Sequence, residues 1–208
     1  MLIEHDGKRP RIHASAYIAP TATVSGDVAI GPECRVLFGA TLTSEGGPVV
    51  LGSHCIVMEG AVIRGTRVHP LRIGDHVLVG PRAYLTGCTV EECAFLAAGT
   101  TVFNGAMIGA RAEVRINGVV HVGTRVAPDA VVPIGWVAVG DPAAILPPHE
   151  HDRIWAIQEA LDFPGTVFGL ERASSGETIM PELTRRYCRA LGRHHADRVL
   201  GHRASPDL

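Results

Sequence analysis

The sequence predicts a mainly β protein, a parallel β-helix of hexapeptide repeats with C-terminal α-helices. Three observations predict it: apolar residues at a strict six-residue spacing, a small or short residue four positions after each of them, and a composition with 24 Gly but only 5% aromatic residues. An α-helix repeats every 3.6 residues and a plain strand every 2, so neither explains a period of six.

The clearest repeat runs from Val90 to Val132. Its apolar positions are Val90, Leu96, Val102, Ile108, Val114, Val120, Val126 and Val132. The short residues four positions later are Ala94, Thr100, Ala106, Ala112, Gly118, Thr124 and Ala130. We expect each hexad to form one side of a triangular coil, with the apolar residue pointing inward and the short residue letting the chain turn the corner.

The same register starts at Ile12 and is interrupted twice. It shifts before Leu51 and again before Ile73, which predicts loops at 44–48 and 65–72. About twenty hexads make six to seven coils, stacked roughly 4.8 Å apart as strands are in any sheet. We assign residues 1–146 to the β-helix, with residues 1–11 as a short strand that covers the open edge of the first coil.

Residues 147–208 are predicted to be a helical extension that packs on the β-helix. Pro142, Pro147 and Pro148 end the solenoid, because proline cannot sit in a central strand. Helical spacing then appears in HEHDRIWAIQEAL, followed by a loop, FPGTVFGLERASSGE, and a second helix from about Pro181 to about Leu200.

Composition narrows the function classes. A net charge of −2 and a pI of about 6.6 give no electrostatic reason to expect nucleic acid or a membrane as partner. The sequence has neither an apolar run of transmembrane length nor the layout of a signal peptide, so we expect a cytoplasmic protein. The cysteines Cys34, Cys55, Cys88 and Cys93 fall within coils and are interpreted as reduced, small apolar fillers.

A family resemblance rests on three segments. These are IGDHVLVGPRAYLTGCTV at 73–90, GAMIG at 105–109 and VAVGDPAAI at 137–145. Together they resemble the γ-class carbonic anhydrases, which are left-handed β-helix proteins and usually trimers. The resemblance covers roughly residues 12–146. It implies a left-handed β-helix, a homotrimer, and a site between neighbouring subunits.

The residues that carry the family's chemistry differ in this sequence. Family members hold zinc through histidines in V-I-H, I-G-H and L-H-G-C motifs, where this chain has Arg64, Pro81 and Thr86. Thr43 and Met58 stand where the family has a supporting Arg and Gln. Arg and Pro cannot ligate zinc and a Thr hydroxyl is a poor substitute for imidazole, so the sequence predicts no metal, no cofactor and no zinc-bound hydroxide.

The hexad register predicts what lines the cleft instead. One outward column holds Thr43, Arg64, Thr86, Phe103 and His121, and a trimer of the family type would bring a second column opposite it. We therefore predict a small anionic molecule in the cleft, with proton transfer by His121 or Glu59. The predicted binding residues are Arg64, Thr86, Arg82, Tyr84, Asn104 and Arg115.

Alternatives remain open at this stage. Arg64 could serve only as an ion-pair partner of Glu59 or Glu45, and His121 could be a solvated outward residue. The protein could also be a coenzyme A-dependent hexapeptide acyltransferase with His121 as its base, or a trimer with no catalytic activity. Coenzyme A binding would distinguish the acyltransferase from the others.

Overall fold

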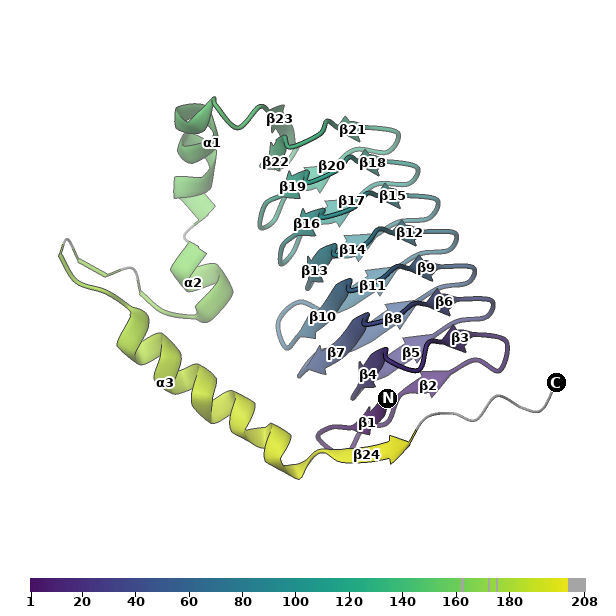
Figure 1. Ribbon diagram of the computed structural model, residues 1–208. Helices are drawn as coiled ribbons and strands as arrows, with labels where there is room; N and C mark the ends of the chain where they lie inside the picture. The colour runs from purple at the N-terminus through teal and green to yellow at the C-terminus, as the bar shows by residue number, and fades with distance from the viewer. Residues whose placement is uncertain (162, 172, 175, 202–208) are drawn as a thin grey trace.

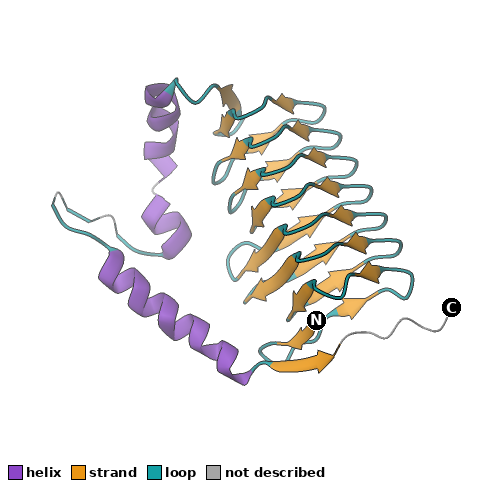
Figure 2. Cartoon of the chain, in the orientation of Figure 1, coloured by secondary structure: helices purple, strands orange, loops and turns teal. Residues whose placement is uncertain are grey.

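A computed structural model describes residues 1–161, 163–171, 173–174 and 176–201 of the 208-residue chain. Three parallel sheets form the sides of a triangular solenoid, and a helical segment runs back along one side (Figures 1 and 2). Two of the sheets contain seven strands each, in agreement with the predicted six to seven coils.

Each sheet contains every third strand of the solenoid, and the ten-stranded sheet has β23 and β24 added at its two ends. The ten-stranded sheet contains β1 (Leu2–Glu4), β4 (Thr23–Ser25), β7 (Thr41–Glu45), β10 (Val62–Thr66), β13 (Tyr84–Thr86), β16 (Thr101–Val102), β19 (Val119–Val120), β22 (Val137–Val139), β23 (Ala144–Leu146) and β24 (Arg198–Gly201). The second sheet contains β2 (Arg11–Ile12), β5 (Val28–Ile30), β8 (Val49–Leu51), β11 (Leu71–Ile73), β14 (Thr89–Val90), β17 (Met107–Ile108) and β20 (Arg125–Val126). The third sheet contains β3 (Tyr17–Ile18), β6 (Arg35–Val36), β9 (Ile56–Val57), β12 (Leu78–Val79), β15 (Phe95–Leu96), β18 (Glu113–Val114) and β21 (Val131–Val132).

The hexad residues form the core. In the ten-stranded sheet Leu42, Ile63 and Leu85 stack in register and are 0% exposed, as the sequence predicts. Burying each such side chain contributes roughly 1.5–3 kcal/mol relative to leaving it in water. The residues that follow them, Thr43, Arg64 and Thr86, are also paired in register and point outward. This confirms the predicted column for these three residues, which lie one above the next.

Both predicted loops are shorter than expected, because β7 extends to Glu45 and β10 to Thr66. These two residues pair in register, so the strands continue outward past the core before the chain turns. The loops are left as 46–48 and 67–70. The longer strands bring Glu45 onto the same outer face as Arg64. The predicted lead-in strand is confirmed, since β1 pairs with β4 of the first coil.

The C-terminal segment departs from the prediction in two places. Helix α1 (His151–Gln158) continues into a 3-10 turn, η1 (Glu159–Leu161), as expected, but the predicted loop contains a further helix, α2 (Phe163–Phe168). Helix α3 (Met180–Leu191) ends well before Leu200. A 3-10 turn, η2 (Gly192–Ala196), and β24 replace its last turns.

Strand β24 pairs antiparallel with β1, so the end of the described chain lies against its beginning (Figure 1). Strand β24 provides hydrogen-bond partners for the edge of β1 that faces away from β4, so this edge of the solenoid is not left open. Helices α2 and α3 consequently lie along the outer face of the ten-stranded sheet. None of the helices in the described ranges has the length and apolar character that a membrane crossing needs.

The cysteine prediction is confirmed for three residues and wrong for one. Cys34, Cys55 and Cys88 are buried and free, whereas Cys93 is free but exposed. Cys93 adopts a positive φ of 60° at a coil corner, which turns its side chain away from the interior.

Candidate ligand-binding site

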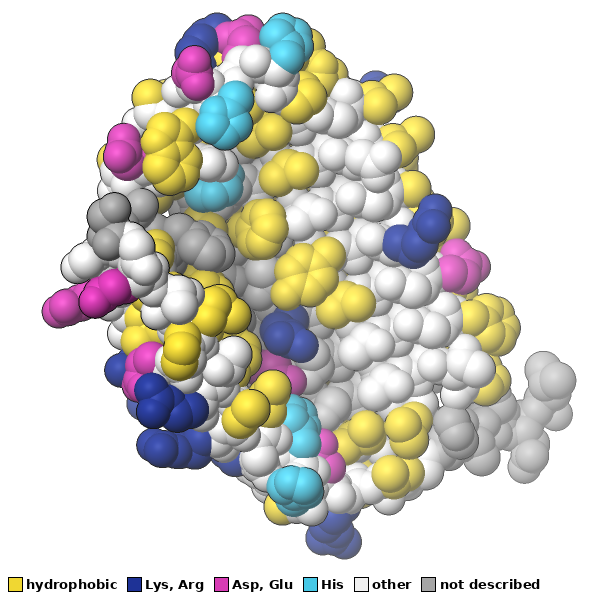
Figure 3. Space-filling view, turned by 60° about the vertical axis from the view of Figure 1, so that its left-hand side comes forward, with side chains coloured by type: hydrophobic (Ala, Val, Ile, Leu, Met, Phe, Trp, Pro, Cys, Tyr) yellow, Lys and Arg dark blue, Asp and Glu magenta, His cyan; other side chains and the backbone are white. Residues whose placement is uncertain are grey.

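A cavity of about 380 Å³ lies between the ten-stranded sheet and the C-terminal segment. The sheet contributes Glu45, Arg64, Thr66, Tyr84, Thr86, Phe103 and Asn104. The C-terminal segment contributes Val167, Phe168, Tyr187, Ala190, Leu191 and Arg193. In the space-filling view, hydrophobic, basic and acidic side chains meet along the groove between the helices and the solenoid (Figure 3). The four predicted binding residues Arg64, Thr86, Tyr84 and Asn104 are therefore brought together.

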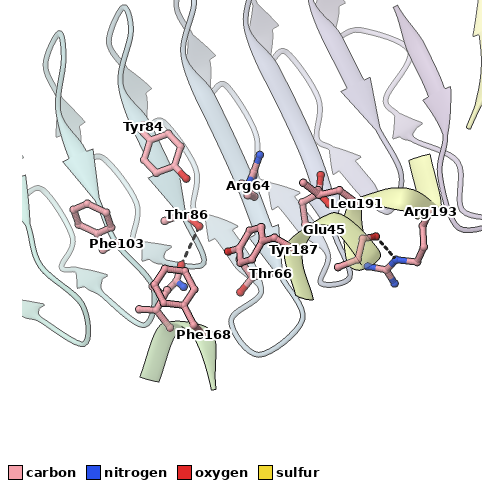
Figure 4. Close-up of a pocket in the computed structure, with 13 residues that line it drawn as sticks. Glu45, Arg64, Thr66, Tyr84, Thr86, Phe103, Phe168, Tyr187, Leu191 and Arg193 are labelled. Atoms are coloured by element: carbon pink, nitrogen blue, oxygen red, sulfur yellow. Dashed lines mark hydrogen bonds between the residues drawn. The ribbon is translucent and has the colours of Figure 1, made fainter. Parts of the chain in front are cut away.

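Arg64 has no anionic partner among the described residues. Its side chain is half-buried at the centre of the pocket, between Tyr84 and Glu45 (Figure 4). The Nε–H group is buried and has no hydrogen-bond acceptor in the described part of the chain. Glu45 is engaged elsewhere, by the Thr43 hydroxyl at 3.1 Å and by His194 at 3.3 Å. A buried donor without an acceptor costs free energy, so an acceptor from outside the described residues would stabilise it.

A buried hydrogen bond fixes the wall beside Arg64. The Thr86 hydroxyl donates to the Asn104 Oδ1 atom at 2.9 Å, and the two residues are 6% and 7% exposed. Because the amide oxygen is used in this bond, the amide nitrogen of Asn104 keeps its donor hydrogens for other partners.

Gly87 makes this arrangement possible. Its φ is +50°, and a Cβ atom there would lie 2.6 Å from the Cβ of His69 and 3.0 Å from the Asn104 Oδ1. A side chain would therefore displace both the loop and the amide. The glycine lets the chain turn directly after Thr86 while Asn104 stays in contact with it.

Aromatic rings form the rest of the wall. Tyr84 and Phe103 come from the sheet, and Phe168 and Tyr187 come from α2 and α3. Phe168 and Tyr187 meet edge to face, with ring centroids 5.9 Å apart. The Arg64 guanidinium lies among these rings and has no anionic partner among the described residues. A ligand with a negatively charged group and an apolar body would match such a pocket.

His121 lies on the predicted column but does not line the pocket. Its ring is 6.3 Å from that of Phe103, centroid to centroid, and Phe103 stands between it and the cavity. Burial lowers the pKa of His121, and its Nδ1 atom has no hydrogen-bond partner among the described residues. The ring is consequently neutral at pH 7.

The other predicted residues lie at the corners where the third sheet turns into the ten-stranded sheet. Glu59, Arg82 and Arg115 are exposed there, and none of them lines the pocket of its own chain. Arg115 forms an ion pair with Glu113. These residues can reach such a pocket only from a neighbouring subunit.

Two relatives match this sequence over half of its length or more. Gamma carbonic anhydrase 1, mitochondrial, of Arabidopsis thaliana is 30% identical over 196 residues, which cover 91% of this chain and 68% of that protein. The chain belongs to the γ-carbonic anhydrase family. A carbonic anhydrase of Geobacillus kaustophilus is 32% identical over 109 residues, which cover 52% of this chain and 60% of that protein. No family model matches the chain.

Two solved structures of hexapeptide-repeat transferases have a similar fold. A hexapeptide transferase family protein from Anaplasma phagocytophilum has a TM-score of 0.52 at 23% identity, covering 77% of this chain and 91% of that one. UDP-N-acetylglucosamine O-acyltransferase from Moraxella catarrhalis has a TM-score of 0.50 at 20% identity, covering 89% and 88%. At these identities the likeness concerns the fold alone, the predicted left-handed parallel β-helix.

The match to the Arabidopsis relative also corrects the predicted extent of the resemblance. It covers 196 residues and therefore reaches beyond residues 12–146 into the C-terminal segment. The sequence prediction rested on the hexad motifs, which end where the solenoid ends, so the weaker similarity of the helices went unnoticed.

At the three positions that the sequence motifs equate with the family's zinc ligands, the side chains present are a poor donor set for a zinc ion. Arg64 and Thr86 are register neighbours on β10 and β13, and Pro81 lies in the turn before β13. Arg64 offers only N–H donors, proline offers no side-chain donor atom, and threonine offers a neutral hydroxyl. Among the described residues, the group of histidines and carboxylates that could hold an ion is His5, Glu45 and His194.

The sequence did not point to the part of the pocket made by the C-terminal segment. Tyr187 and Leu191 lie four residues apart on α3 and therefore share one face, and this spacing was the available signal. The side of the solenoid that this face covers is set by the turns between α1 and α3, for which the sequence has no strong pattern.

Proposed function

We propose that this member of the γ-carbonic anhydrase family binds a small organic anion in the Arg64 pocket, in place of the metal chemistry of its relatives. The anion is a carboxylate with an apolar, preferably aromatic, body. The observation that carries the proposal is the half-buried Arg64 side chain, whose Nε–H has no acceptor among the described residues although it faces a cavity of about 380 Å³.

The chemistry of the wall supports a carboxylate. A guanidinium binds a carboxylate through two parallel N–H···O bonds, and such charge-assisted bonds are about twice as strong as neutral ones. Asn104 has donor hydrogens left after its bond with Thr86 and can contribute a further N–H. The rings of Tyr84, Phe168 and Tyr187 provide apolar area for the rest of the ligand.

The same proposal states that zinc is absent from the positions of Arg64, Pro81 and Thr86. Without a metal at these positions there is no bound water with a pKa near 7 and no hydroxide to attack CO2. The protein should therefore not hydrate CO2 by the zinc-hydroxide route.

A trimer is part of the proposal. The outward positions of the third sheet form a register column of Tyr17, Arg35, Ile56, Leu78, Phe95, Glu113 and Val131. Tyr17, Ile56, Phe95 and Val131 are 41%, 38%, 37% and 45% exposed. A mostly apolar column on a flat sheet is suited to a subunit interface. A trimer would also place Glu59, Arg82 and Arg115 of one subunit near another subunit, where His121 or Glu59 could move a proton. The buried free thiols suit the reducing cytoplasm.

Calorimetric titration with phenylacetate tests the binding proposal, with phenylacetamide as the uncharged analogue. The wild-type protein should bind the acid and bind the amide much more weakly. Arg64→Met should reduce the affinity for the acid by roughly thirtyfold, which corresponds to about 2 kcal/mol. Arg72→Met is the matched control, because Arg72 is exposed on β11 of the second sheet and does not line the pocket.

Equal affinities of the Arg64→Met and Arg72→Met variants would contradict the proposal, as would equal binding of acid and amide. The same titration with coenzyme A examines the acyltransferase alternative. Saturable coenzyme A binding that survives Arg64→Met would replace the anion-pocket proposal with that alternative. Binding of neither compound would favour a scaffold without a ligand.

A further inference from the structure

Two histidines and two carboxylates from distant parts of the chain meet at the N-terminal end of the pocket. His5 follows β1, Glu45 ends β7, and His194 and Asp197 lie in and after η2. The ligand atoms of His5, Glu45 and His194 all lie within 4.8 Å of one another. We propose that these three residues form a divalent metal site, separate from the positions that hold metal in relatives.

Asp197 orients both imidazoles toward this point. Its Oδ1 atom accepts a hydrogen bond from His5 Nδ1 at 2.6 Å, and its Oδ2 atom accepts one from His194 Nδ1 at 2.9 Å. To bind an ion, each ring must carry its proton on Nδ1 and its lone pair on Nε2, so the Nε2 of His194, 3.3 Å from Glu45, would bind the ion in place of a proton. Metal-binding histidines show this pattern, in which a carboxylate holds one ring nitrogen and the other faces the ion.

The Nε2 atom of His5 is buried and forms no hydrogen bond with the described residues. The His5 side chain is 2% exposed. The Asp6 Oδ2 atom is 3.7 Å away, too far for a hydrogen bond. A buried Nε2 atom within 4.8 Å of a second imidazole nitrogen and a carboxylate oxygen is explained by an ion between them.

The spacing fits a first-row ion after a small contraction. Glu45 and His194 Nε2 are already 3.3 Å apart. Ligand atoms about 2.1 Å from a zinc ion are roughly 3.0–3.5 Å from each other, so from a separation of up to 4.8 Å the third ligand needs to approach by up to about 1.5 Å. A cavity of about 200 Å³ lined by His5 and Ser44 has room for water at the remaining coordination position.

The charge of the cluster also suits a cation. Glu45 and Asp197 bring two carboxylates to the stacked imidazoles of His5 and His194, whose centroids are 4.3 Å apart. Three basic side chains line the adjacent cavity: Arg193 pairs with Asp6 at 3.1 Å, Lys8 pairs with Asp27 at 3.2 Å, and Arg67 is the third. A divalent ion would balance the charges of the two carboxylates.

Two nitrogen ligands, one carboxylate and an open position suit zinc or a neighbouring divalent first-row metal. His5 and Glu45 belong to the solenoid and His194 to the C-terminal segment. The ion would therefore fasten the end of α3 to the first coils. Glu45 also lines the anion pocket, so the ion would hold α3 in place over it. The sequence predicts a metal-free protein, because nothing in it indicates that residues 5, 45 and 194 lie together.

Zinc binding to the full chain tests the site, measured by competition with a chelating dye and by the thermal midpoint. The wild type should bind about one zinc per chain and unfold at a higher temperature with zinc than without it. His194→Gln should weaken zinc binding at least roughly tenfold and abolish the thermal shift. Asp197→Asn, which leaves all three ligands in place, should weaken binding by about ten- to a hundredfold.

His195→Gln is the matched control, because His195 is the exposed neighbour in the same turn. It should bind zinc within about twofold of the wild type. Loss of binding in His194→Gln and Asp197→Asn but not in His195→Gln supports the site. Absence of saturable zinc binding by the wild type, or equal binding by the two histidine variants, would overturn it.

Discussion

Replacing Arg64 by methionine should make the ligand-free protein more stable. The Nε–H of Arg64 is buried without an acceptor in the described part of the chain, and such a group costs about 1–3 kcal/mol. Methionine keeps an apolar stem of similar length and removes the unpaired donor. Part of the gain is offset by packing lost at the pocket, so we expect a net stabilisation of roughly 1 kcal/mol.

For a chain of this size, 1 kcal/mol corresponds to a rise of about 2–4 °C in the thermal midpoint. Calorimetric melting in a buffer free of carboxylates and phosphate measures it. Arg82→Met, at an exposed position, should change the stability by less than about 0.5 kcal/mol. A fall of 1 kcal/mol or more in Arg64→Met would refute the reasoning, because it would mean that Arg64 forms a structural ion pair, for example with Glu59 of another subunit.

Four further results are expected. Thr86→Val should destabilise the fold by about 1–3 kcal/mol in denaturant titrations, because it leaves the buried Asn104 oxygen without its donor. Gly87→Ala should lower the free energy of unfolding by roughly 2 kcal/mol or more, because the new Cβ would meet His69. Gly123→Ala is its control: Gly123 has φ +65° and nothing within 4 Å of a Cβ, so the change should cost only about 1 kcal/mol for the backbone conformation. NMR titration should give His121 a pKa below the usual value of about 6.5 for histidine. The folded state then binds fewer protons than the unfolded state, so the contribution of His121 to stability is complete above about pH 6.5 and declines as the pH falls below it. His121→Gln should remove this decline. Light scattering should give about three times the 22.0 kDa chain mass, and Phe95→Glu, which puts a charge in the apolar column, should lower it toward one chain.

The sequence was sufficient to predict the solenoid because the hexad register is a local, repeated signal. Once the register is known, Arg64 and Thr86 must stack on adjacent coils, and the structure pairs them as expected. Glu45 was harder to place, because the register break before Leu51 predicts a loop that starts at residue 44. In the structure β7 continues through that point, since it gains a partner in the equally extended β10.

The C-terminal segment was predictable only as helical spacing. Nothing local distinguishes α2 from a loop in FPGTVFGLERASSGE, and the pairing of β24 with β1 joins residues almost two hundred positions apart. The meeting of His5 with Asp197 depends on the same pairing. Contacts of this range follow from the path of the whole chain, so they cannot be read from spacing.

The most direct test of the anion-pocket proposal is a crystal structure of the protein grown with phenylacetate. The account predicts both carboxylate oxygens about 2.7–2.9 Å from the Arg64 guanidinium, with the ring of the ligand against Tyr84 and Phe168. A structure at saturating phenylacetate in which Arg64 is paired with a protein carboxylate and the pocket holds only water would contradict it.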